Sequence, residues 1–375
     1  MSVAELVARA EQNMQICNAC RYCEGFCAVF PAMERRLTFT ENDLHYLANL
    51  CHNCGACYYA CQYAPPHEFN VNVPRNFGDL RAETYKRYAW PEAFGALYAH
   101  NGIAVSLITA ASLALVLLLT MFLQKPEVVF SAHPGGNFYA VIPHNAMAWS
   151  FSLVSLFVLL AFTMGFTRFW RDMGEKLSAF ARPVTLAQAT WDALRLRYLD
   201  GGPEGEGEGC TYPTETPSNL RRVFHHFTFY GFMLCFAATS VATFYHYVLK
   251  LPAPYPVLSL PVLLGITGGI GLLIGPVGLV WLKHRADPDT QAPAQRGMDT
   301  GFLVLLFLTS LTGLALLVWR ESAGMGVLLA VHLGIVLALF LTLPYGKFVH
   351  AIYRFAALVR YALERSRPAP NVTFE

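Results

Sequence analysis

The chain has 375 residues, of which 55% are hydrophobic and only 14% charged, and its mean hydropathy is +0.38. Soluble domains carry about 25% charged residues, so this composition excludes a chain that is soluble throughout. The net charge of +2 gives no indication of a nucleic-acid partner, and we expect none.

Eight of the ten cysteines lie before residue 62, in two runs with the same spacing. The pattern C-x2-C-x2-C-x3-C is typical of proteins with two [4Fe–4S] clusters, in which the fourth cysteine of each run ligates the other cluster. Two four-cysteine zinc sites are the alternative, but zinc ribbons pair two CxxC motifs and do not add a third and fourth cysteine this way. We therefore predict two clusters with the ligand sets Cys17, Cys20, Cys23 and Cys61, and Cys51, Cys54, Cys57 and Cys27.

Helical patterns precede both runs in the head, residues 1–78. Thr40-x-x-Asp43 has the form of a capping box that opens a helix, and Ala4–Gln15 has a comparable pattern. These helices favour an α-helical type of ferredoxin over the β-rich bacterial type. The head also holds three histidines, for which we expect ordinary polar roles: His45, His52 and His67.

A juxtamembrane linker, 79–101, leads to a membrane domain, 102–346. This domain contains six uncharged stretches near or above the ~20 residues that cross a bilayer. They are Ile103–Leu123, Ala146–Phe166, Val223–Leu249, Leu258–Leu282, Gly301–Trp319 and Met325–Leu343. The predicted fold class is therefore all-α, a ferredoxin head followed by a six-helix transmembrane bundle.

Lysine and arginine concentrate on one side of these spans. The loop 168–222 and the basic tail 347–375 are rich in them, whereas the opposite loops carry only Lys125, Lys250 and Arg320. By the positive-inside rule both termini are expected in the cytoplasm, at a bacterial inner membrane. The first residues, MSVAELVARAEQNM, have no apolar core of a signal peptide, which agrees with a head in the reducing cytoplasm.

Histidines occur near both ends of the third and sixth spans. His332 and His350 are 18 residues apart (350 − 332), which is five helical turns and predicts a common face. We expect His225 to face His350 and His246 to face His332, each pair ligating a haem b. His226 lies off the shared face, so His225 is the preferred ligand.

The number of haems is left open between one and two, with two favoured. No CxxCH motif is present, so any haem is bound without a covalent link. The alternative for each histidine is that it caps a helix end at the membrane interface. His100 and His144 are the reserve ligands. Cys235 is expected to be a packing residue, and Cys210 has no assigned role.

The cysteine runs and four further segments resemble the tricarballylate utilization protein B family, also called citrate utilization protein B. The segments are PPHEFNVNVPRNF (65–77), LRYLDGG (196–202), RRVFHHFTFYGFMLCFAATSVATFYHY (221–247) and LPYGKFVH (343–350). The helix from His332 to His350 also resembles the haem-bearing gamma subunit of membrane nitrate reductases. The resemblance implies a partner, an FAD-dependent tricarballylate dehydrogenase, whose reduced flavin this chain would reoxidise with quinone as the final acceptor.

Two other functions remain open. An iron–sulfur and haem membrane subunit of a different flavin dehydrogenase or of a heterodisulfide-reductase-like complex would share the same cofactors and differ only in its partner. The absence of a Rossmann fingerprint places the flavin on another chain in either case. A tricarboxylate transporter is disfavoured, because the eight cysteines have no role in transport and the spans contain no Arg or Lys.

Overall fold

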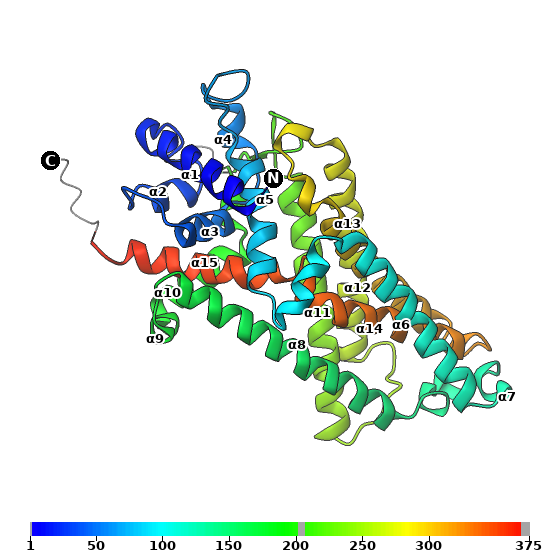
Figure 1. Cartoon of the computed structure of the whole chain (residues 1–375). Coiled ribbons are helices and arrows are strands. Elements are labelled where there is room, and N and C mark those ends of the chain that lie inside the picture. The colour runs from blue at the N-terminus through cyan, green and yellow to red at the C-terminus, as the bar shows by residue number, and fades with distance from the viewer. Residues whose placement is uncertain (1, 202–206, 369–375) are drawn as a thin grey trace.

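The computed structural model describes residues 2–201 and 207–368. Figure 1 shows a head of short helices on one side and long helices on the other. The described residues are overwhelmingly helical, and their strands are the two-residue pair β1 (Cys210–Thr211) and β2 (Pro217–Ser218). The prediction of an all-α fold is confirmed.

The head begins with helices whose first turns are capped by their own side chains. Its helices are α1 (Val3–Cys20), α2 (Val29–Met33), α3 (Glu41–Leu50), α4 (Ala56–Tyr59) and α5 (Val73–Arg87). The predicted capping box at Thr40 is present, since the Asp43 backbone N–H donates to Thr40 Oγ1 at 3.2 Å and the Asp43 carboxylate accepts from the Thr40 N–H. This box satisfies two of the donors that a helix start leaves free, and it fixes where α3 begins before the second cysteine run.

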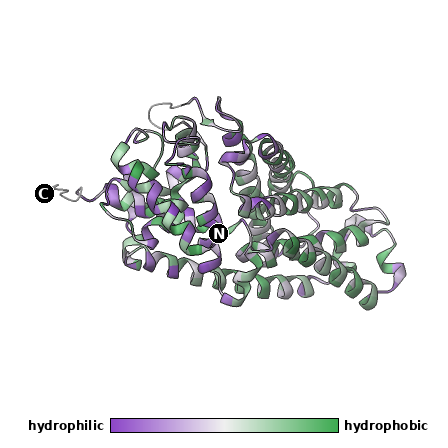
Figure 2. Ribbon diagram, turned by 45° about the horizontal axis from the view of Figure 1, so that its top comes forward, coloured by the Kyte–Doolittle hydropathy of each residue, from purple (hydrophilic) through white to green (hydrophobic). Residues whose placement is uncertain are grey.

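Six helices in the described part of the chain are long and apolar enough to cross a membrane. The helices of this bundle are α6 (Asn101–Leu123), α8 (His144–Asp172), α11 (Leu220–Tyr247), α12 (Leu260–Arg285), α13 (Arg296–Val318) and α14 (Met325–Thr342). Figure 2 shows them as hydrophobic along their length, in contrast to the more hydrophilic head. Large apolar side chains point outward, such as Phe122, which is 85% exposed. Such a surface suits lipid rather than water, as predicted.

Short elements connect the long ones. The remaining α-helices are α7 (Pro126–Val129), α9 (Leu177–Phe180), α10 (Pro183–Leu194) and α15 (Val349–Arg365). The 3-10 turns are η1 (Glu92–Tyr98), η2 (Pro134–Gly136), η3 (Phe138–Ala140), η4 (Arg197–Leu199), η5 (Pro288–Thr290), η6 (Pro293–Gln295) and η7 (Leu343–Tyr345). The expected end of the head at residue 78 falls inside α5, which continues to Arg87.

Glycines allow α11 and α12 to pack backbone to backbone. A Cβ on Gly268 would lie 2.7 Å from the Gly231 carbonyl oxygen, closer than side chains tolerate. Small residues at such crossings are the usual way in which membrane helices approach closely. This contact fixes the position of α11, which carries three of the predicted haem ligands.

The helix that was expected to carry both His332 and His350 is interrupted. Residues Leu343–Tyr345 form the 3-10 turn η7, and Gly346 has the extended angles φ −129° and ψ −165°. Pro344 lacks a backbone N–H, and its ring is incompatible with a helix interior. The two histidines therefore belong to different helices, α14 and α15, and the prediction that they share one helical face is wrong.

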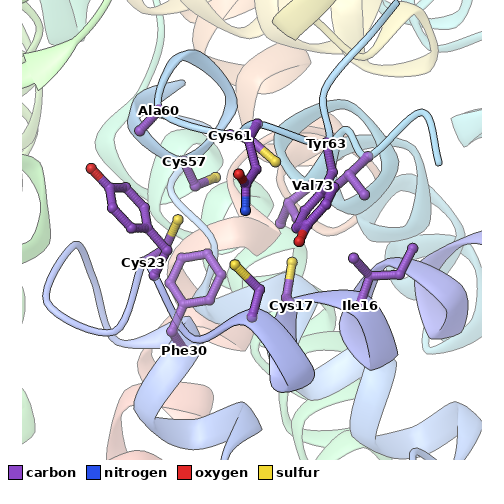
Figure 3. Close-up of a pocket in the computed structure, with 13 residues that line it drawn as sticks. Ile16, Cys17, Cys23, Phe30, Cys57, Ala60, Cys61, Tyr63 and Val73 are labelled. Atoms are coloured by element: carbon purple, nitrogen blue, oxygen red, sulfur yellow. The ribbon is translucent and has the colours of Figure 1, made fainter. Parts of the chain in front are cut away.

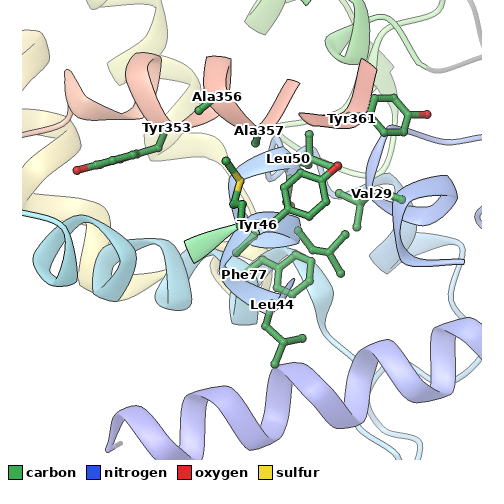
Figure 4. Packing of buried hydrophobic residues seen from close by; sticks show 14 of the residues in the cluster. Val29, Leu44, Tyr46, Leu50, Phe77, Tyr353, Ala356, Ala357 and Tyr361 are labelled. Carbon is green, nitrogen blue, oxygen red and sulfur yellow. The ribbon is translucent and has the colours of Figure 1, made fainter. Parts of the chain in front are cut away.

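The helix α15 lies across the head instead of forming a free tail (Figure 4). Figure 4 shows Ala356 and Ala357 above Tyr46 and Leu50, and all four are fully buried. The Tyr46 hydroxyl donates to Glu364 Oε2 at 2.9 Å. Small residues on α15 thus complete the core of the head. The last part of the expected tail, 369–375, lies outside the described residues.

Candidate metal centres

The first cysteine group consists of Cys17, Cys20, Cys23 and Cys61, one of the two predicted ligand sets. These four residues line a cavity of about 290 Å³, and Figure 3 shows the labelled sulfurs directed into it. Burial and the neighbouring sulfurs of Cys23, Cys61 and Cys20 raise the pKa of Cys17 to about 12. Crowded sulfurs of this kind need positive charge among them before they can exist as thiolates.

The second cysteine group consists of Cys51, Cys54, Cys57 and Cys27. Burial and the sulfurs of Cys54 and Cys51 raise the pKa of Cys27 well above its usual value. Burial and the same two sulfurs do the same to the pKa of Cys57. The structure thus brings Cys27 to the second run and Cys61 to the first, as the ferredoxin pattern requires. Cys57 also lines the cavity of the first group, so the two groups adjoin.

The arrangement of these sulfurs suits clusters better than single ions. A zinc site places its sulfur and nitrogen ligands about 2.0–2.3 Å from one atom, whereas a cluster is held by thiolates on separate irons. The cavity between converging cysteines fits the second arrangement.

Cys210 is a neighbour of the second group that the sequence did not reveal. It is 3% exposed and lies on β1, which follows a linker with no motif. The Cys210 thiol donates a hydrogen bond to the Cys54 sulfur. This bond is the largest cause that lowers the pKa of Cys54, to about 6, despite burial. Gly55 permits this approach, since it has φ +84° and a Cβ there would lie 2.7 Å from the Thr211 carbonyl oxygen.

The inner histidine pair, His225 on α11 and His350 at the start of α15, is brought together as predicted. The ring centroids are 6.1 Å apart at an interplanar angle of 80°. An iron between two imidazoles requires about 6 Å, from two bonds of roughly 2 Å and the distance from each nitrogen to its ring centre. His350 Nδ1 lies 2.8 Å from the Lys347 carbonyl oxygen. That bond leaves Nε2 free to ligate an iron. A metal-bound histidine usually makes such a hydrogen bond with its other ring nitrogen.

His225 Nδ1 has no partner among the described residues. His226 faces elsewhere, with its ring 5.5 Å from that of Tyr230. The geometry therefore favours His225 over His226 as the partner of His350, in agreement with the helical-wheel argument.

The outer pair is not assembled in this way. The ring of His246 stacks on His144 with centroids 4.0 Å apart, which leaves no space for an iron between them. His332 Nδ1 instead lies 3.0 Å from Thr312 Oγ1, and no ring contact within the described residues joins His332 to His246. The reserve ligand His100 is exposed at the start of α6. The expected pairing of His246 with His332 stays a prediction that no contact supports.

Comparison with known proteins covers almost the entire chain. Residues 99–371 match the family described as citrate utilization protein B, and residues 10–87 match the citrate utilization protein B Fer4-like domain. A protein of Escherichia coli named "Citrate utilization protein B" is 53% identical over 367 residues, which are 97% of this chain and 94% of that protein. The chain belongs to the citrate utilization protein B family. No solved structure matches it.

In this member of the citrate utilization protein B family, the backbone at His52 contacts the helix that carries His225. His52 directly follows Cys51, and its carbonyl oxygen accepts from Arg221 of α11 at 2.8 Å. Burial and the charges of Arg354 and Arg221 lower the pKa of His52 well below its usual value, so its ring is neutral. The ordinary polar role that the sequence suggests for His52 stays a prediction.

Proposed function

We propose that this protein is a membrane electron-transfer protein that reoxidises the reduced FAD of a partner tricarballylate dehydrogenase. Electrons pass through two [4Fe–4S] clusters and haem b to the quinone pool. The clusters and the haem supply one-electron carriers when they are bound, which divides a two-electron flavin oxidation into single steps. The Fer4-like domain and the six apolar helices support this proposal.

The observation that carries the proposal is the order of the sites. The first cysteine group borders a cavity near the surface, beside Tyr22, which is 66% exposed. The second group lies deeper, and Cys51 is 6% exposed. Next to Cys51, the His52 carbonyl oxygen accepts from Arg221 of α11, the helix that also carries His225 of the inner histidine pair. This order of the sites supports a path from a soluble donor through the clusters and the haem to a lipid-soluble acceptor.

We further propose that the head faces the cytoplasm of a bacterial inner membrane. The distribution of lysine and arginine among the loops supports this orientation. In this arrangement a soluble flavoprotein reaches the first cysteine group directly, while the inner histidine pair lies near the depth at which quinone diffuses.

The test is stopped-flow absorbance with reduced dehydrogenase, this protein in membranes and a quinone. Flavin should be oxidised quickly only when both the protein and the quinone are present. Cys54→Ala should stop flavin oxidation, whereas His350→Ala should leave the clusters reducible but block quinone reduction. Cys235→Ala, which changes a cysteine of a span, is the matched control and should behave as the wild type.

Two results would contradict the proposal. Haem that stays oxidised while electrons reach quinone at the normal rate would show that the haem is not on the path. Rapid reduction of the clusters by a different flavin dehydrogenase, with none by tricarballylate dehydrogenase, would contradict the proposed partner. The proposed electron-transfer chemistry would stand.

A further inference from the structure

A polar pocket of about 70 Å³ lies at the junction of the head and the bundle. Four cationic side chains line it, contributed by α5, α11, α12 and the segment before α15: Arg81, Arg221, Lys283 and Lys347. Among the described residues that line it, Asp299 is the single carboxylate. The lining therefore has three more positive than negative charges (4 − 1).

These charges are not balanced by the protein that surrounds them. Lys347 Nζ lies 2.8 Å from Asp299 Oδ1, and Lys283 pairs with the same carboxylate. Arg221 donates only to the backbone oxygens of His52 and Asn53, both at 2.8 Å. Within 2–201 and 207–368, neither arginine of the pocket has a carboxylate partner.

Arg81 is the more deeply buried of the two arginines. It is 4% exposed; its Nη atoms donate to neutral oxygens of Ala48, Cys51 and Asn53, and its Nε has no partner among the described residues. Buried charges are costly unless they are paired. The pocket is thus built for an anion.

The pocket adjoins the inner histidine pair. Arg221 precedes His225 by four residues on α11, and residues four apart lie on the same face of a helix. Lys347 precedes His350 by three residues and accepts its Nδ1 hydrogen bond through the backbone oxygen. A group bound between the two histidines would therefore have this pocket beside one edge.

We propose that the pocket binds the two propionate carboxylates of the haem held by His225 and His350. This inference rests on the proposed function, since it requires a haem at that pair. Haem b carries both carboxylates on one edge, and two of them would offset two of the three excess charges. About 70 Å³ is room for a few water molecules, which suits carboxylate groups better than a free tricarboxylate anion. A small free anion shares the same chemistry and is distinguished below.

The test compares Lys283→Gln with Arg222→Gln. The side-chain hydrogen bond of Lys283 within the described residues goes to Asp299 of the bundle, so its loss breaks no hydrogen bond to the head. Arg222 lies one residue from Arg221 but pairs with Asp200 outside the pocket. Lys283→Gln should weaken haem binding by about tenfold or more, the value of one charge-assisted hydrogen bond. Lys283→Arg should restore binding, and Arg222→Gln should leave it unchanged.

Reconstitution with haem dimethyl ester, which has no free carboxylate, gives the second measurement. The wild type should bind the ester more weakly than haem, and Lys283→Gln should bind the ester as well as the wild type does. Equal affinity of the wild type and Lys283→Gln for haem, measured in protein that contains haem, would overturn the pocket assignment alone. A purified wild type without any haem would overturn the proposed function as well.

The source of the anion is tested separately with citrate and with inorganic phosphate. Neither should raise the melting temperature of haem-loaded protein through the pocket. Stabilisation that Lys283→Gln abolishes, together with unchanged haem affinity, would assign the pocket to a free anion and overturn the propionate assignment.

Discussion

Replacing Cys210 by alanine should lower the reduction potential of the cluster proposed for the second cysteine group. The Cys210 thiol donates a hydrogen bond to the Cys54 sulfur and is 3% exposed, so water cannot easily replace it. Donors to cluster sulfurs favour the reduced state, which carries the extra negative charge. A net hydrogen bond is worth about 0.5–1.5 kcal/mol. At about 59 mV per 1.4 kcal/mol for one electron, the expected decrease is roughly 20–60 mV.

The assay is a redox titration followed by electron paramagnetic resonance of the reduced clusters. One of the two signals should shift in Cys210→Ala, and the other should stay in place. Cys210→Ser retains a hydroxyl donor and should remain near the wild-type potential. Cys235→Ala removes a cysteine that is distant from both groups in the sequence and is the control. An unchanged potential in Cys210→Ala, or an equal shift in the control, would refute the role of this hydrogen bond.

Three further changes test other parts of the structure. Cys57→Ala should remove about four of about eight cluster irons by chemical analysis and leave the haem spectrum intact; stoichiometric zinc without acid-labile sulfide would contradict the clusters. His225→Ala should abolish the reduced b-type absorbance of the inner haem, whereas His226→Ala should retain it, and the opposite result would exchange the ligands. Gly268→Ala should destabilise the protein by about 1–3 kcal/mol, because its Cβ would meet the backbone of α11 at 2.7 Å. Thermal unfolding should show no such loss for Gly265→Ala, whose Cβ would have 3.8 Å of space.

Local patterns predicted much of this molecule. The cysteine spacing anticipated which residues come together, because loops of two residues constrain where the sulfurs can lie. The Thr40 capping box and the hydrophobic stretches likewise predicted the start of α3 and the spans. In each case the information lies within a few turns of chain, where helical geometry is nearly invariant.

The failures concern contacts between distant segments. The spacing of His332 and His350 was interpreted as one helix, although Pro344 lies between them and is a helix breaker. The stacking of His144 on His246 depends on how the start of α8 packs against the end of α11, which no periodicity reveals. The approach of Cys210 to Cys54 depends on a connection of more than 150 residues, and it has no local signature.

The position of α15 has a consequence for the order in which the protein matures. This helix supplies the fully buried Ala356, Ala357 and Leu363 to the core of the head, yet it is translated after all six spans. Domains generally fold as they emerge from the ribosome, starting from the N-terminus. Here the head is synthesised first, but its core is complete only after α15, nearly the last segment, has been made. Any iron–sulfur cluster would then enter a finished head only after membrane insertion, and a truncation before α15 would leave the head without part of its core.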